Sequence, residues 1–331
     1  MTRLKQIALA GFAALAIGGV ASSASASETG TFENRLNGAT IGLPLGALPP
    51  PGLYTGLETA YLGMLSGSSS SGHATGNQGS AVLPAVAQAV PLLWVPGWSF
   101  LGANYSASLV QAFYVWSGCI NTPNLGCGGA APIGIGGMVY TNTYIQPINL
   151  SWNLGGGWFG AIGFAFTPPD GTRQIGTPNP DYWTFEPSLA ISYLANNWVL
   201  SANFFYDINT QSAGVCCSAD STITSGNLFY GDLTAVYKFG KWEFGPVGYF
   251  EVQTTSDTGA GCLAGLCGNH ETVALGGLVG YDFGPVDLQV WVTDNLVGTN
   301  SPDGPDAIHV WTRLGFKLWG YEAPKPLVAK N

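Results

Sequence analysis

The sequence predicts an all-β protein, a 12-stranded antiparallel outer-membrane β-barrel with short periplasmic turns and long extracellular loops. In residues 182–210, apolar and polar residues alternate over a long stretch that is broken by Ala195-Asn196-Asn197. This pattern indicates a β-hairpin with long strands. Short turns and long loops alternate along the chain, as they do in bacterial outer-membrane barrels. Charged residues make up only 9% of the chain, against about 25% in average domains, which suits a lipid-facing exterior better than a soluble β-sandwich.

The N-terminus predicts export. A basic start and an apolar run precede Ala24-Ser25-Ala26, which fits the cleavage site of a secretory signal peptide over residues 1–26. The apolar run is shorter than the roughly 20 residues that a membrane helix needs. Residues 27–52 show no strong periodicity and form a lead-in that is a candidate plug. Residues 53–319 are then the barrel, and residues 320–331 are a C-terminal tail.

The strands follow in order, each with alternating apolar residues and each bounded by Gly, Pro, Asn or Ser. Residues 81–95 are the ambiguous case, because Pro84 and Pro91 interrupt them and a short helix also fits. The short turns fall near residues 96, 156, 196, 240 and 284. The expected strands are residues 53–63, 81–95, 98–116, 138–154, 158–167, 182–194, 198–210, 224–239, 242–255, 271–283, 286–297 and 306–319.

Most charged residues in these strands fall on the face opposite the apolar one. A Lys or Arg facing lipid at mid-depth would cost about 2–4 kcal/mol, so this face is predicted to line the lumen. Phe205, Tyr230 and Trp291 share it and would offer apolar contacts to a solute. The predicted lumen-lining residues are Glu58, Glu186, Asp207, Asp232, Lys238, Glu243, Glu251, Asp282, Asp287, His309, Arg313 and Lys317. The alternative reading is that these residues pair across the lumen and only brace the wall.

Tryptophans gather beside the short turns on the apolar register. Trp and Tyr are enriched where a protein crosses a membrane–water interface. Trp152, Trp158, Trp198 and Trp242 are therefore predicted to form a periplasmic interface belt.

Six cysteines are expected in the extracellular loops of this exported chain. An even number of cysteines in an oxidising compartment predicts disulfides. Cys119–Cys127 and Cys262–Cys267 are the natural local pairs, while the adjacent Cys216 and Cys217 leave the pairing open.

Several kinds of site are not expected. There is no C-x-x-C motif, and His270 is the only candidate metal ligand near the cysteines, so no metal site is predicted. There is also no G-x-S-x-G motif, and no histidine falls on the apolar face, so no catalytic residue and no cofactor are predicted. The net charge of −9 argues against nucleic acid as a partner.

Four segments resemble the outer-membrane family named for the meta-pathway of phenol degradation. They are PPPGLY at residues 49–54, YWTFEP at 182–187, YGD at 230–232 and GYDFG at 280–284. The resemblance spans roughly residues 37 to 319. It implies a transporter or channel associated with the breakdown of aromatic and other hydrophobic compounds. The loop cysteines and the tail that follows Trp319 depart from the usual pattern.

These observations together predict a channel in the Gram-negative outer membrane for passive uptake of small hydrophobic or aromatic compounds. Outer-membrane lipid and the solute are the expected partners, and the oligomeric state stays open. One alternative is a closed structural or surface-binding barrel with disulfide-braced loops. A second is an outer-membrane lipid hydrolase, which would need a Ser–His pair on the outer face.

Overall fold

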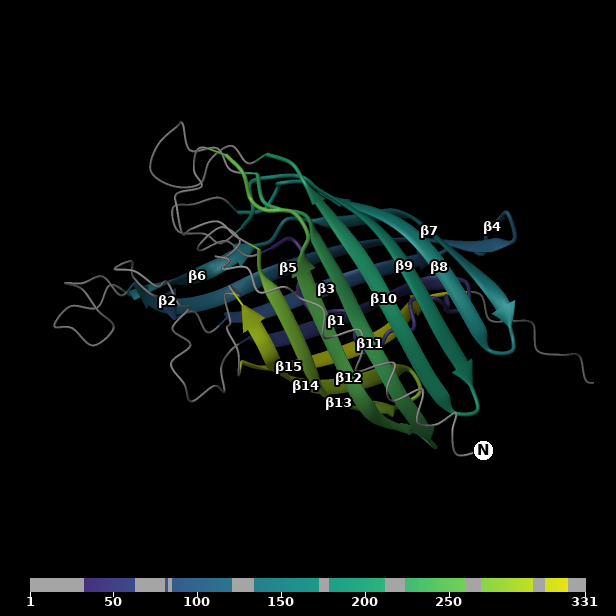
Figure 1. Cartoon of the computed structure of the whole chain (residues 1–331). Coiled ribbons are helices and arrows are strands. Elements are labelled where there is room, and N and C mark those ends of the chain that lie inside the picture. Colours follow the sequence, from purple (N-terminus) through teal and green to yellow (C-terminus); the bar gives the residue numbers. More distant parts are fainter. Residues whose placement is uncertain are drawn as a thin grey trace, which may run out of the picture.

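Twelve antiparallel strands pair with their neighbours and close into a barrel, as the sequence predicted (Figure 1). The structure is a computed structural model, and it describes residues 33–62, 81–82, 85–120, 134–172, 179–211, 224–259, 269–299 and 307–320. Pairing of β1 with β15 and of β5 with β7 closes the sheet. The barrel strands are β1 (Gly52–Leu62), β3 (Ala85–Val95), β5 (Ala103–Ile120), β7 (Tyr144–Gly155), β8 (Trp158–Thr167), β9 (Thr184–Ala195), β10 (Trp198–Asn209), β11 (Leu228–Phe239), β12 (Trp242–Gln253), β13 (Glu271–Asp282), β14 (Val286–Thr299) and β15 (Ile308–Trp319).

Side-chain burial alternates along the strands. In β9, Thr184 and Glu186 are buried, while Leu189 is 55% exposed on the opposite face. The apolar face is therefore the outer surface and the polar face is the inner one, which is the arrangement of a barrel in lipid. Within the described part of the chain, no helix is long and apolar enough to cross a bilayer.

Tight turns at one end of the barrel fix the strand register. Asn196 and Asn197 connect β9 and β10 with φ of 53° and 65°, the two positive values that a type I′ hairpin turn requires. Asn tolerates this conformation better than most residues do. We call this end the short-turn end, and the opposite one the long-loop end.

The predicted interface tryptophans lie at the short-turn end. Trp158, Trp198 and Trp242 are exposed, and each packs on a tyrosine of the neighbouring strand with ring centroids 4.7–5.1 Å apart. Trp152 is half-buried and donates a hydrogen bond from Nε1 to the carbonyl of Leu101 (3.1 Å). Their role as a membrane-interface belt stays a prediction.

The region before β7 differs most from the sequence-based expectation. The ambiguous residues 81–95 are not helical: they contain β3 and a short strand, β2 (Ala81–Val82). The next strand starts at Ala103 rather than at residue 98, because β4 (Ser99–Phe100) folds back onto β5 through a turn at Leu101 and Gly102.

The expected strand over residues 138–154 is two strands, β6 (Gly134–Tyr140) and β7. Asp170 holds the break between them by accepting bonds from the backbone N–H and hydroxyl of Thr143 (2.8 and 2.7 Å).

Cys119 lies in a strand and not in a loop, which corrects the sequence-based placement. β5 continues to Ile120 because β2 and β6 both pair with its far end. The other five cysteines and residues 1–26 lie outside the described residues, so the disulfides and the signal peptide stay predictions.

Candidate functional site

A chain segment crosses the barrel interior from end to end. We call residues 33–51 the inner segment. Asn34 Nδ2 donates to Thr184 Oγ1 (2.7 Å) at the long-loop end of β9. The backbone N–H of Gly46 donates to Ser192 Oγ (3.0 Å), near the short-turn end of the same strand. The inner segment therefore descends through the lumen and enters β1 at the short-turn end.

Arg35 is the principal cation of the inner segment. Its guanidinium donates to both carboxylate oxygens of Glu186 (3.2 Å each) and lies 3.8 Å from an oxygen of Asp232. It also lies 3.3 Å from the ring centroid of Phe205, an arrangement that adds cation–π attraction. Tyr144 donates to the same Glu186 carboxylate (2.9 Å). A buried charge is costly unless it is paired and hydrogen-bonded, so this cluster holds Arg35 in one place.

Asp232 is the main acceptor for the backbone of the inner segment. Its carboxylate accepts from the backbone N–H of Gly38 (3.1 Å) and from the N–H and hydroxyl of Thr40 (2.9 and 2.6 Å). On the neighbouring strand, Asn203 donates to the carbonyls of Thr40 and Leu43 (3.3 and 3.0 Å). These side chains satisfy backbone groups that would otherwise be buried without partners.

Arg313 holds the segment from the other side of the lumen. It is paired with Glu58 (Nε to Oε1, 2.5 Å) and lies over the ring of Trp291 (4.7 Å). Its two terminal nitrogens donate to the carbonyls of Ile41 and Ala39 (2.6 and 2.5 Å). One side chain of β15 therefore binds two successive turns of the inner segment.

Ile41 is the apolar anchor of the segment. It is fully buried and belongs to the same hydrophobic cluster as the inner-face residues Leu278, Trp291 and Trp311. A hydrophobic cluster shared by the inner segment and the wall therefore occupies the described barrel interior at this level.

At the long-loop end, the inner segment meets the wall through a charged cluster. His270 Nε2 lies 3.3 Å from Glu33 Oε1 and contacts a carboxylate oxygen of Glu251. Asn37 donates to the other oxygen of Glu251, and Tyr230 donates to Glu33 (2.9 Å). One ligand atom from each of Glu33, Glu251 and His270 lies within 4.8 Å of the others, so this cluster contains the residues that could hold a metal ion.

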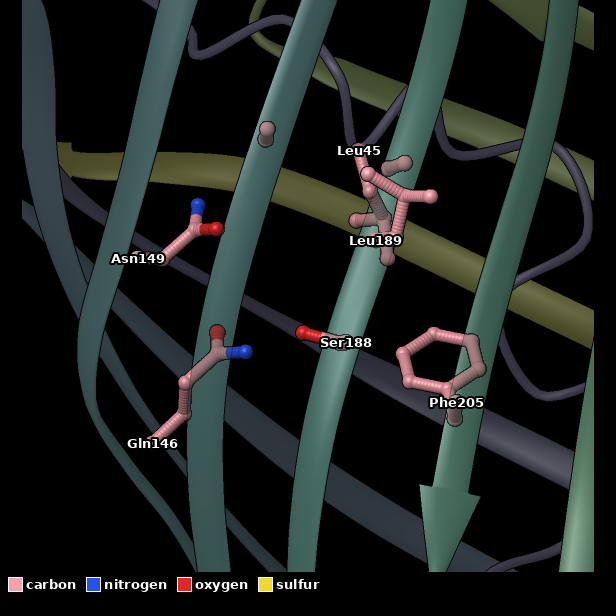
Figure 2. A pocket seen from close by; sticks show the side chains of 8 residues that line it. Leu45, Gln146, Asn149, Ser188, Leu189 and Phe205 are labelled. Carbon is pink, nitrogen blue, oxygen red and sulfur yellow. The ribbon is translucent and has the colours of Figure 1, made fainter.

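A small pocket remains between the inner segment and β7–β10 (Figure 2). Its cavity volume is about 30 Å³, well below the roughly 300 Å³ at which ligand sites usually start. Figure 2 shows the amides of Gln146 and Asn149 on one side, Leu45 and Phe205 on the other, and Ser188 between them. The pocket therefore combines apolar surface with hydrogen-bonding groups, in a space for about one or two water molecules.

The predicted lumen-lining residues separate into two groups. The buried ones, inside the barrel, are Glu58, Glu186, Asp207, Asp232, Glu251, His309 and Arg313. Those at the short-turn end, which are exposed or half-buried, are Lys238, Glu243, Asp282, Asp287 and Lys317. The structure brings Glu186, Asp232, Glu251 and Arg313 onto the inner segment and pairs Glu58 with Arg313, whereas Lys238 pairs with Glu243 at the rim (3.9 Å). Whether they line a passage stays a prediction.

Sequence reasoning missed the charged partners that the lead-in supplies, Glu33 and Arg35. One signal was available: acidic residues outnumber basic ones on the predicted inner face, and Arg35 is a cation in the segment proposed as a plug. The absence of a catalytic site stays a prediction too. His270 and His309 are both buried inside the barrel, and His73 lies outside the described residues.

Comparisons with known proteins agree with this architecture. The COG4313 outer membrane channel from Pseudomonas putida F1 has a TM-score of 0.63 and 12% identity, with 82% of this chain and 96% of that chain covered. The TodX monoaromatic hydrocarbon channel, a deltaS2 mutant, has a TM-score of 0.44 and 10% identity over 89% of this chain and 96% of that chain. The NanC porin has a TM-score of 0.42 and 13% identity over 80% of this chain and 100% of that chain. At these identities the first likeness shows the fold alone, and the two lower scores carry no argument.

No curated protein matches the sequence. A sequence profile does match, over residues 66–314, and its family is described as "Putative MetA-pathway of phenol degradation". Because this match covers most of the chain, the chain belongs to that family.

Proposed function

We propose that the protein is an outer-membrane channel for passive uptake of small hydrophobic or aromatic compounds. In this proposal, the inner segment is a plug that must shift before a solute passes. The family description supports the link to aromatic compounds. The polar inner face of the barrel supports the proposal that a solute passes through the lumen.

The observation that carries this proposal is the polar wall beneath the inner segment. Buried inner-face residues include Ser192, Ser201, Asn203 and Thr234. Polar interiors are typical of outer-membrane barrels that hold a water-filled channel or a plug, and here polar side chains lie beside the apolar cluster around Ile41. These side chains can hydrogen-bond to water when the inner segment moves away, so an open state would leave few of them unsatisfied.

The inner face also favours a particular kind of solute. Phe205 and Leu45 offer apolar contact, and Ser188, Gln146 and Asn149 offer hydrogen bonds (Figure 2). The cavity is too small for a ring in this conformation, but once the inner segment is displaced these groups would suit a ring that carries a hydroxyl group, such as a phenol.

In this proposal, acidic groups on the inner face determine which solute charge the channel passes most readily. Five carboxyl groups are buried on the inner face of the described strands, those of Glu58, Glu186, Asp207, Asp232 and Glu251, whereas the buried arginine there is Arg313 and the inner segment adds Arg35. Unbalanced carboxylates repel anions at close range. The channel should therefore pass neutral phenols in preference to aromatic carboxylates.

The test is solute flux into liposomes that contain the purified, refolded barrel, with phenol and benzoate compared at neutral pH. We expect phenol to enter faster than benzoate, and we expect Phe205→Ala to reduce the phenol preference. Phe164→Ala is the matched control, because Phe164 is 41% exposed on the outer face. A barrel that passes neither solute, even with the inner segment removed, would contradict the proposal and leave the closed structural barrel.

A further inference from the structure

The charged cluster at the long-loop end has the composition of a transition-metal site. It combines one imidazole, His270, with the carboxylates of Glu33 and Glu251. Zn²⁺ takes His nitrogen and Glu oxygen ligands at about 2.0–2.2 Å, so two ligands of one ion lie at most about 4.4 Å apart. The three ligand atoms already lie within 4.8 Å of one another. Small side-chain shifts would place all three around one ion.

The surroundings of the cluster supply a second observation. Asn37 contacts Glu251 through Nδ2, while its buried Oδ1 has no hydrogen-bond partner among the described residues. Rotation of this amide about its last side-chain bond would exchange the two atoms and turn the oxygen toward the cluster. A bound cation would use the amide oxygen of Asn37 as a ligand. If only hydrogen bonds held the cluster together, this oxygen would have no role.

Charge and burial favour a divalent ion at this place. His270 and Glu251 are each 2% exposed. Metal ligands must be deprotonated when the ion binds, and a neutral imidazole with two carboxylates would then balance the two positive charges of the ion. Buried charges must be paired or coordinate a metal. Tyr230 donates to Glu33 (2.9 Å) and so orients one ligand from outside the cluster, as partners of metal-bound carboxylates do.

We propose that Glu33, Glu251 and His270, with the amide oxygen of Asn37, bind one Zn²⁺ ion. The imidazole favours zinc over calcium or magnesium, which prefer oxygen ligands alone. Glu33 and Asn37 belong to the inner segment, whereas Glu251 and His270 belong to the wall. The bound ion therefore fastens the inner segment to the wall at the long-loop end, where the segment enters the lumen.

The test measures zinc directly and does not depend on the channel proposal. Untagged, refolded protein with alkylated cysteines is dialysed against Zn²⁺, and bound metal is counted by mass spectrometry. We expect one zinc per chain in the unmodified sequence, and at least tenfold weaker binding in Glu33→Gln and His270→Gln. Glu33 lies outside every barrel strand, so Glu33→Gln leaves the wall intact and keeps the test valid if His270→Gln misfolds. His309→Gln is the matched control, because it removes the other described histidine of the lumen.

X-ray absorption at the zinc edge supplies an independent readout. We expect nitrogen and oxygen ligands at about 2.0–2.2 Å, whereas sulfur ligands at about 2.3 Å would assign the metal to cysteines. Sulfur ligation overturns the proposal. So does an absence of bound zinc, or equal binding by the unmodified chain and by Glu33→Gln.

Discussion

The barrel wall and the inner segment are held by different kinds of interaction. β9 and β10 pair from Ala195 and Trp198 to Thr184 and Asn209 with one interruption at Pro187, and every other pair of neighbouring barrel strands also forms an antiparallel ladder. Within the described residues, the inner segment joins no ladder. It is bound by wall side chains, chiefly Asp232 and Arg313, that reach its backbone groups.

This difference suggests that the two parts can separate. Removing the inner segment breaks side-chain contacts but leaves the backbone hydrogen bonds of the wall complete. Local openings of a protein draw on regions with few cooperative backbone bonds. We therefore expect the segment to leave the lumen at a free-energy cost well below that of unfolding the barrel.

The largest effect on the inner segment should come from Asp232→Ala. This change removes the acceptor of three hydrogen bonds and one counter-ion of Arg35. Breaking a buried charge pair from one side costs about 3–5 kcal/mol. We expect more frequent channel openings in planar bilayers and faster proteolysis of the inner segment. Asp287→Ala is the control, since Asp287 is exposed at the short-turn end. Equal behaviour of the two variants would contradict the view that the inner segment is held separately from the wall.

Ile162→Arg should destabilise the barrel wall and leave the inner segment unaffected. Ile162 is 49% exposed on the outer face of β8, and an Arg facing lipid near mid-depth costs about 2–4 kcal/mol. We expect a lower free energy of unfolding in lipid vesicles and unchanged proteolysis of the inner segment. Ile162→Val is the conservative control. Loosening of the segment by Ile162→Arg would show that segment and wall are coupled.

A smaller effect is expected from Gly42→Ala. Gly42 has a φ of 81°, and an added Cβ would lie 2.7 Å from Oε1 of Gln289. A non-glycine residue in the left-handed region costs about 1–2 kcal/mol. Conductance recordings should show more frequent openings than in the unmodified protein. Gly315→Ala on β15 is the control, because an added Cβ there meets nothing within 4 Å, and its opening frequency should match that of the unmodified protein. If it opened as often as Gly42→Ala, a specific role for the inner segment would be contradicted.

The smallest effect on stability and on release of the inner segment is expected from a change at the rim of the barrel. The Lys238–Glu243 pair is 3.9 Å apart and the lysine side chain is 57% exposed, and such surface pairs contribute about 0–1 kcal/mol. Lys238→Gln should leave both unfolding and segment release nearly unchanged. A large shift in either measurement would mean that the rim also holds the inner segment.

The strand pattern could be predicted from the sequence because alternation is local. Residues on one face of a strand recur at every second position, so the hairpin of β9 and β10 is visible without any tertiary information. Residues 81–95 stayed ambiguous because of Pro91. Proline has no N–H to donate, and the pairing of β1 with β3 is interrupted between Thr55–Leu92 and Glu58–Ala89.

The contents of the lumen could not be predicted in the same way. Arg35 and Asp232 are separated by almost two hundred positions in the sequence. The residues around each one contain no signal that predicts contact with the other. Charge balance could indicate that an acidic lumen needs cations, but only the folded barrel brings Arg35 onto Glu186 and Phe205.

The most direct test of this account is the single-channel conductance of a chain that lacks residues 33–47, compared with that of the full chain. Correct folding of both is checked first by their heat-modifiable mobility on gels. The account predicts a stepwise larger conductance in the shortened barrel, and closure when a synthetic peptide of residues 33–51 is added. A folded, shortened barrel with the conductance of the full chain would contradict it, because the inner segment would then not be what closes the lumen.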